Sequence, residues 1–147
     1  MKKIICASLI MLVAAAVVGC CPCRKTRKTA EPFVGTTWHL IQLAGQDLQL
    51  ADNTFNITFR NDNMVSGVGS CNRFNAKYNV DMEKESLDIG VIASTRMLCP
   101  DSETEQRLFI ELDGTTHYEI DGSILILINN GEIRALFSAV ERVAEEE

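Results

Sequence analysis

Short segments in which apolar and polar residues alternate recur along this chain of 147 residues. The clearest is Phe55–Arg60, where every second side chain is apolar. A period of two puts one set of side chains on a buried face and the other in water, which is typical of a half-buried β-strand. Further segments of this alternating or β-rich kind lie at 35–41, 74–80, 87–89, 116–121, 124–129 and 132–138.

The last three of these segments are joined by tight turns. Asp121-Gly122 separates the first two, and Asn129-Asn130-Gly131 separates the second from the third. Turns of this composition connect neighbouring antiparallel strands, so the sequence predicts an antiparallel meander at the end of the chain. Together with the earlier segments, it predicts roughly eight strands.

Residues 102–113 have the periodicity of a helix instead. Ser102 and Glu105 match a capping box, in which the hydroxyl group accepts from an amide and the carboxylate reaches back to the helix start. Leu108 and Leu112 lie four residues apart on one face. The predicted fold class is therefore mostly β with a single α-helix, either an antiparallel, strongly curved sheet around the helix or a β-barrel plugged by it.

The N-terminus has the features of an export signal. Met1-Lys2-Lys3 is basic, and the apolar run 4–18 that follows is shorter than the ~20 residues that a membrane-spanning helix needs. The run ends in Val17-Val18-Gly19-Cys20, which resembles the bacterial lipobox. The resemblance implies that 1–19 is a signal peptide and that Cys20 is lipidated; the alternative is an ordinary secretory peptide cleaved nearby.

Three regions follow the signal peptide. Residues 20–33 are expected to form a flexible tether, either a solvated linker or a segment whose basic side chains touch anionic lipid headgroups. We expect the domain to span 34–140 and an acidic tail to occupy 141–147. The protein would be lipid-anchored in the bacterial cell envelope, and Pro22 in place of an aspartate favours the outer membrane. The basic residues of the tether are Arg24, Lys25, Arg27 and Lys28.

The charge and the histidines exclude several kinds of function. The formal net charge is −6 and there is no basic stripe, so nucleic acid is not expected as a partner. The two histidines, His39 and His117, have no metal-ligand spacing, and no nucleophile-elbow string is present. We therefore expect no enzymatic activity, no cofactor and no metal site.

The chain has six cysteines, of which Cys71 and Cys99 lie in the domain. In an exported protein such a pair predicts a disulfide, although two free thiols in the core are the alternative. Cys21 and Cys23 stand two apart without a nearby histidine or a second pair, so they do not indicate zinc.

A disulfide between the domain cysteines would gather several polar residues. Asn72, Arg73, Arg96 and Met97 would then lie close together, with both arginines able to pair with domain carboxylates. Such a cluster is either a recognition site or, as we favour, a structural network that satisfies polar groups at a barrel corner.

Several strings resemble a known family. They are Gly35–Leu40, Ser66–Tyr78, Ala93–Pro100 and the pair Glu105-Gln106. Their order and content resemble the META domain of HslJ-like bacterial envelope lipoproteins. The resemblance implies a lipocalin-like β-barrel with one helix, an envelope location and links to heat-shock response and antibiotic tolerance, and it implies no established enzymatic activity.

We therefore expect a non-catalytic, monomeric envelope lipoprotein that serves stress tolerance or protein interaction. Its partners would be the membrane, through the lipid anchor, and another envelope protein. The alternative is a barrel that binds a small apolar ligand, which an apolar, solvent-open void above ~300 Å³ would favour. The large side chains available to fill the interior favour a packed core. They include Phe55, Ile57, Phe59, Phe74, Tyr78, Leu108, Phe109, Leu112, Tyr118 and Phe137.

Overall fold

The computed structural model describes residues 30–140. The predicted signal peptide, the lipidation of Cys20, most of the tether and the acidic tail lie outside the described residues. The strands are β1 (Thr37–Leu43), β2 (Gln46–Asp47), β3 (Asn56–Phe59), β4 (Met64–Val68), β5 (Arg73–Asp81), β6 (Ser86–Ile89), β7 (Ala93–Ser94), β8 (His117–Asp121), β9 (Ile124–Asn129) and β10 (Glu132–Ala139), and the helix is α2 (Ser102–Asp113).

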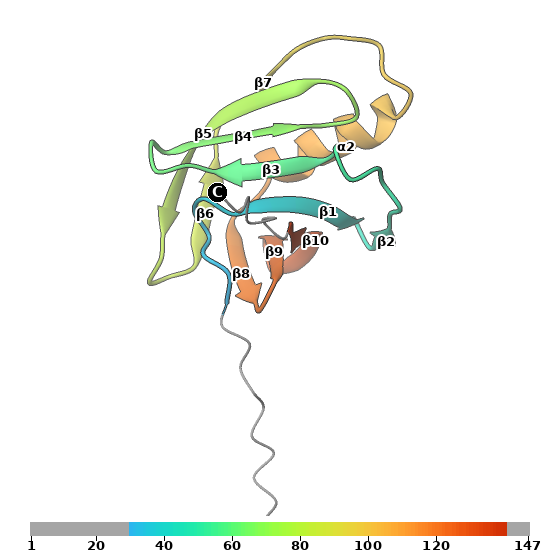
Figure 1. Ribbon diagram of the computed structural model, residues 1–147. Coiled ribbons are helices and arrows are strands. Elements are labelled where there is room, and N and C mark those ends of the chain that lie inside the picture. Colours follow the sequence, from blue (N-terminus) through green and yellow to red (C-terminus); the bar gives the residue numbers. More distant parts are fainter. Residues whose placement is uncertain (1–29, 141–147) are drawn as a thin grey trace, which may run out of the picture.

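The strands form one antiparallel sheet that closes into a barrel. Its order is β10-β9-β8-β6-β5-β4-β3-β1-β2, and β10 also pairs with β1. The closing ladder runs from Trp38 opposite Ala139 to Leu43 opposite Ala135. Eight strands make the ring, while β2 and β7 pair at its margin (Figure 1). The predicted fold class, a mostly β antiparallel barrel with one helix near 102–113, is confirmed.

The C-terminal meander shows how local turn residues set the register. Glu132 lies opposite Asn129, so only two residues connect β9 to β10. Both of them, Asn130 and Gly131, have positive φ angles of 50° and 87°. This conformation suits asparagine and glycine, and its twist matches that of the flanking strands.

The antiparallel ladders give the barrel two distinct ends. At one end, which we call the helix end, β1, β4, β6 and β9 finish and the other four strands of the ring begin. Here α2 packs across the sheet, and its buried Leu108 and Leu112 join the core. Arg134 of β10 holds the helix through two hydrogen bonds to Glu111, of 2.8 and 2.7 Å. Figure 1 shows α2 behind the upper right of the ring.

The opposite end, which we call the N-terminal end, is covered by residues 31–35. Phe33 is buried, stacks on Phe59 with a centroid distance of 4.3 Å and lies 4.5 Å from the ring of Tyr118. The indole of Trp38 donates a hydrogen bond of 3.4 Å to the carbonyl of Phe33. The folded part therefore begins before residue 34, so the predicted tether of 20–33 extends too far into the chain.

Both ends of the described chain lie at this N-terminal end. Glu31 donates its amide to Gly122 in the turn between β8 and β9, and Val140 donates to Thr37 at the start of β1. In Figure 1 the first described residues, in blue, lie at the lower left of the ring. The helix end is therefore the part of the domain opposite the point where the chain enters and leaves it.

Large apolar side chains fill the space inside the ring. Trp38 is fully buried. Gly67 allows a close backbone approach, because a side chain there would collide with the carbonyl of Asn56 and the ring of Phe74. Within the described residues, no helix is long and apolar enough to span a membrane. The other large, fully buried side chains are Phe55, Phe59, Phe137, Leu40, Leu43, Ile57, Leu87, Ile89, Leu108, Leu112 and Leu125.

Replacing Phe33 by alanine tests whether residues 31–35 are part of the fold. We expect Phe33→Ala to lower the free energy of unfolding by about 3 kcal/mol, because a buried aromatic ring is lost and a cavity remains. Ile133→Ala, which trims a side chain that is exposed on β10, should change it by less than about 0.5 kcal/mol. Urea unfolding followed by Trp38 fluorescence measures both; equal, small changes would show that Phe33 is not a structural plug.

Candidate functional site

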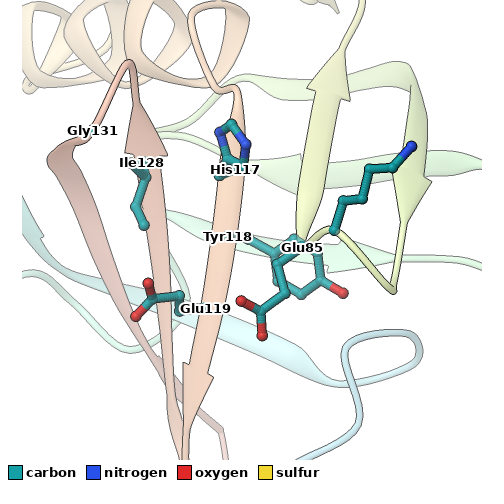
Figure 2. Close-up of a pocket in the computed structure, with 7 residues that line it drawn as sticks. Glu85, His117, Tyr118, Glu119, Ile128 and Gly131 are labelled. Atoms are coloured by element: carbon teal, nitrogen blue, oxygen red, sulfur yellow. The ribbon is translucent and has the colours of Figure 1, made fainter.

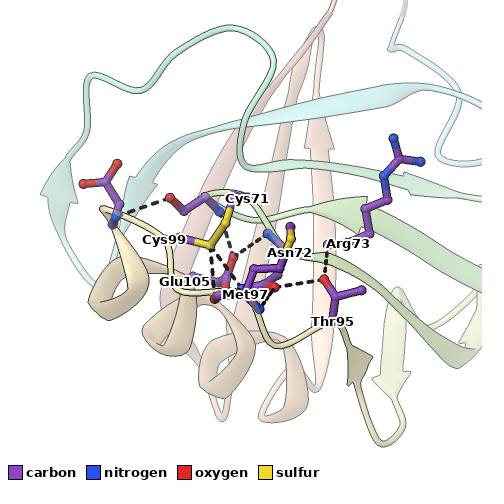
Figure 3. Close-up of a disulfide and its surroundings, with 9 residues drawn as sticks. Cys71, Asn72, Arg73, Thr95, Met97, Cys99 and Glu105 are labelled. Atoms are coloured by element: carbon purple, nitrogen blue, oxygen red, sulfur yellow. Dashed lines mark hydrogen bonds between the residues drawn. A yellow bond between two sulfur atoms is a disulfide. The ribbon is translucent and has the colours of Figure 1, made fainter.

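Asn72 is the centre of a hydrogen-bond cluster at the helix end. Its side-chain oxygen accepts from the amide of Met97 at 2.7 Å and from the hydroxyl of Thr95 at 2.9 Å. Its side-chain nitrogen donates to the carbonyl of Met97 at 3.1 Å and to Glu105 at 2.7 Å. The single buried side-chain amide of Asn72 thus binds the segment before α2 through both its oxygen and its nitrogen (Figure 3).

Glu105 joins this cluster to the helix. Its other carboxylate oxygen accepts from the amides of Ser70 at 2.9 Å and of Asn72 at 3.2 Å. The predicted capping box is wrong: Asp101 is the N-cap residue without a side-chain cap, and Glu105 turns away from the helix start. A buried carboxylate needs donors, and the loop between β4 and β5 supplies more of them than the helix terminus.

The cysteines flank the same cluster. Cys71 and Cys99 form a disulfide whose Cα atoms are 5.7 Å apart, as the sequence predicts. It links the loop between β4 and β5 to the residue before Pro100. The loop it closes spans 28 positions, which corresponds to a stabilisation of about 3.5 kcal/mol in the chain-entropy account.

The four residues expected to form a recognition cluster separate into two kinds. Asn72 is buried, whereas Arg73, Arg96 and Met97 are exposed around it. The expected pairing of the two arginines with domain carboxylates is wrong within residues 30–140, where the ion pairs involve Arg60, Lys84 and Arg134 instead. Figure 3 shows the side chain of Arg73 extending away from the cluster, because alternation along β5 turns odd-numbered residues outward.

Residues 91–98 present apolar side chains to the solvent. Val91 is 89 % exposed, Met97 is 56 % exposed and Leu98 is fully exposed. The backbone beneath them is nevertheless fixed by Asn72, by the disulfide and by the amide of Thr95, which donates to the carbonyl of Arg73 at 3.0 Å. Sequence alternation could not identify this exposed surface, because the segment is neither a regular strand nor a helix over most of its length.

A shallow hollow of about 290 Å³ lies beside the seam between β6 and β8. The two strands pair at one register position, Ser86 opposite His117, so the pairing between neighbouring strands is shortest there. Figure 2 shows side chains of β8, among them His117 and Glu119, along this hollow, and Lys84 also lines it. The ring of His117 forms a hydrogen bond of 3.1 Å with the hydroxyl of Thr116.

The phenol of Tyr118 borders this hollow. Burial, assisted by the charges of Glu85 and Asp81, raises the pKa of Tyr118, so the phenol is protonated at neutral pH. It donates a hydrogen bond of 2.8 Å to the sulfur of Met82. Tyr118 therefore closes the barrel wall at the seam.

A second hollow, of about 360 Å³, exceeds the volume at which a ligand site becomes plausible. However, Arg60, Asn61 and Asp62 make up half of its lining residues, and Arg60 and Asp62 form an ion pair of 2.8 Å. It lies at the turn between β3 and β4, outside the barrel, and the ring of Phe59 beneath it is fully buried. It is therefore a hollow of the outer surface and not a void inside the barrel, where the ligand-binding alternative places the ligand.

The META domain family matches residues 31–141, which is most of the chain. The chain belongs to the META domain family. The matched region begins at the segment that carries Phe33, so the family boundary and the folded boundary agree. No curated protein is significantly similar to this chain.

Solved structures share the fold of this META domain. One is a DUF4847 family protein from Bacteroides vulgatus ATCC 8482, 17 % identical, with a TM-score of 0.56 over 72 % of this chain and 93 % of that one. Another, from Burkholderia xenovorans, is 20 % identical, with a TM-score of 0.59 over 75 % of this chain and 85 % of that one. At this level of identity the likeness is one of fold alone.

Glu105→Ala tests whether the carboxylate organises this end of the barrel. The change leaves the amides of Ser70 and Asn72 without an acceptor and removes one acceptor of the Asn72 side chain, so we expect a loss of about 3 kcal/mol in the free energy of unfolding. Glu103→Ala is the matched control, an exposed acid in the same first turn, and should cost less than about 1 kcal/mol. Equal losses in urea unfolding would contradict the assigned role.

Proposed function

We propose that this META domain is the soluble part of a non-catalytic envelope lipoprotein, anchored through Cys20, whose helix end binds another envelope protein. The observation that carries the proposal is the exposed segment 91–98. Large exposed apolar side chains gathered in one short segment are typical of interaction sites. Val91, Met97 and Leu98 are exposed in this segment, and the backbone of Met97 and of the following residues is fixed by Asn72 and the disulfide, which lowers the entropy lost on binding.

The arrangement of the two ends supports this orientation. Phe33 is fixed at the N-terminal end and lies thirteen positions after Cys20, a reach of at most ~43 Å. An anchor at Cys20 would therefore attach the domain at its N-terminal end and leave the helix end opposite the point of attachment. Residues 30–140 carry sixteen acidic and seven basic side chains, which disfavours close contact of the domain with anionic lipid.

The same features favour binding over catalysis or ligand storage. Large side chains occupy the interior of the barrel, as expected of a packed core without a ligand cavity. A role in stress tolerance would follow from the partner that the helix end recruits.

Removing the acylated thiol tests the anchor. In cells expressing Cys20→Ala, we expect the protein to move from the membrane fraction to the soluble fraction, because the lipid chains would supply nearly all of the membrane affinity. Cys23→Ala, a thiol in the same segment outside the lipobox, is the control and should remain with the membrane. A Cys20→Ala variant that stays membrane-bound would contradict lipidation.

Photocrosslinking in intact cells tests the helix end. A photoreactive residue in place of Leu98 should give a discrete crosslinked band, whereas the same residue in place of Ile133, which is also apolar and exposed, should not. Mass spectrometry of the band identifies the partner. Crosslinking that is equal at the two positions, or absent at both, would contradict an interaction surface at 91–98.

A further inference from the structure

The basic side chains of this domain differ in whether another side chain binds them. Seven lie in the described residues, and four of them bind an acidic or polar side chain: Arg60, Lys84, Arg107 and Arg134. The other three, Arg73, Lys77 and Arg96, have no ion pair or side-chain hydrogen bond within residues 30–140.

These three unpaired cations lie together around β7. Arg73 and Lys77 project from the outer face of β5, four residues apart, and β7 pairs with the residues between them. Arg96 follows Thr95, whose amide binds the carbonyl of Arg73. These side chains form a local positive surface on a domain that has more acidic than basic residues. The surface adjoins the segment 91–98, which carries the exposed apolar side chains.

The register of β7 also gives it an unpaired edge. Because Thr95 and Arg73 form a hydrogen-bonded pair, the neighbouring pair, Ser94 opposite Phe74, belongs to the non-hydrogen-bonded kind. The amide and carbonyl of Ser94 therefore point away from β5. β7 pairs with β5 alone, and Ala93 and Ser94 are both exposed, so this outer edge faces solvent.

We propose that the outer edge of β7 binds an extended, acidic segment of a partner protein, which adds to the sheet as a further strand. Backbone groups of Ser94 would supply the strand pairing, and Arg73, Lys77 and Arg96 would bind the partner's carboxylates. Leu98 and Val91 would contact its apolar side chains. This inference rests on the proposed function and names the chemistry of the partner.

Charge excludes the commonest competing occupant. A second copy of the chain pairing through the same edge would bring two sets of unpaired cations together, which is repulsive. An acidic segment neutralises them instead. Free donors and acceptors on a strand edge also fit a polypeptide backbone better than a lipid surface, which has no periodic partner groups.

A synthetic peptide that alternates Glu with Val is the probe, added to the full-length protein in detergent. We expect binding, and slower amide hydrogen exchange in 91–98 when the peptide is bound, because a new strand protects the outward amide of Ser94. The same peptide with Lys in place of Glu should bind at least about tenfold more weakly.

Two variants separate backbone pairing from charge. Ser94→Pro removes the outward amide at an edge position that tolerates proline, whereas Ser94→Ala keeps it; we expect only the first to lose binding. Arg96→Glu should weaken binding at least about tenfold, and Lys84→Glu, a reversal at the opposite end of the barrel, should not. Unchanged unfolding curves establish that each variant is folded.

The outcomes are distinguishable from those of the proposed function. If crosslinking at Leu98 persists in Ser94→Pro and Arg96→Glu, the interaction surface stands and strand addition is wrong. If vesicles of phosphatidylglycerol bind while the acidic peptide does not, the surface recognises lipid and the proposal is overturned. Concentration-dependent dimers that Ser94→Pro abolishes would show that the occupant is a second copy.

Discussion

Pairing of β1 with β10 is the constraint on which the rest of this structure depends. It joins the first strand to the last, so the sheet has no long free edge in its ring, but it leaves two ends through which water would reach the apolar interior. The protein closes them differently. An aromatic ring, Phe33, covers the end where the chain enters, and an amphipathic helix covers the other.

Covering the second end with a helix has a consequence for function. The carboxylate of Glu105 on the buried face of α2 needs hydrogen-bond donors, and the loop between β4 and β5 supplies them. That loop carries Asn72, whose side chain in turn fixes the segment from Thr95 to Met97. The same interactions that seal the barrel therefore hold an exposed apolar and basic segment in place, at the end of the barrel opposite the chain ends.

The sequence predicts those features that depend on neighbouring residues. Alternation locates β3, β5 and the C-terminal meander, the apolar period gives the helix, and the cysteine count gives the disulfide. It does not predict features that depend on contacts distant along the chain. Glu105 fits a capping box locally, and only the packed loop beneath it shows its actual partners. Phe33 lies next to a basic, proline-containing stretch, so nothing local assigns it to the core, and β7 is too short to have a recognisable pattern.

The central claim is that Asn72 and the disulfide hold residues 95–99 in one conformation without a partner. Amide hydrogen exchange of Met97 in the oxidised protein, resolved by NMR, tests it most directly, since the Met97 amide binds the Asn72 side chain at 2.7 Å. The account predicts slow exchange at Met97, comparable with amides of β5, and faster exchange there after reduction of the disulfide while β5 is unchanged. Exchange at Met97 as fast as in an unfolded chain, with the disulfide intact, would contradict it.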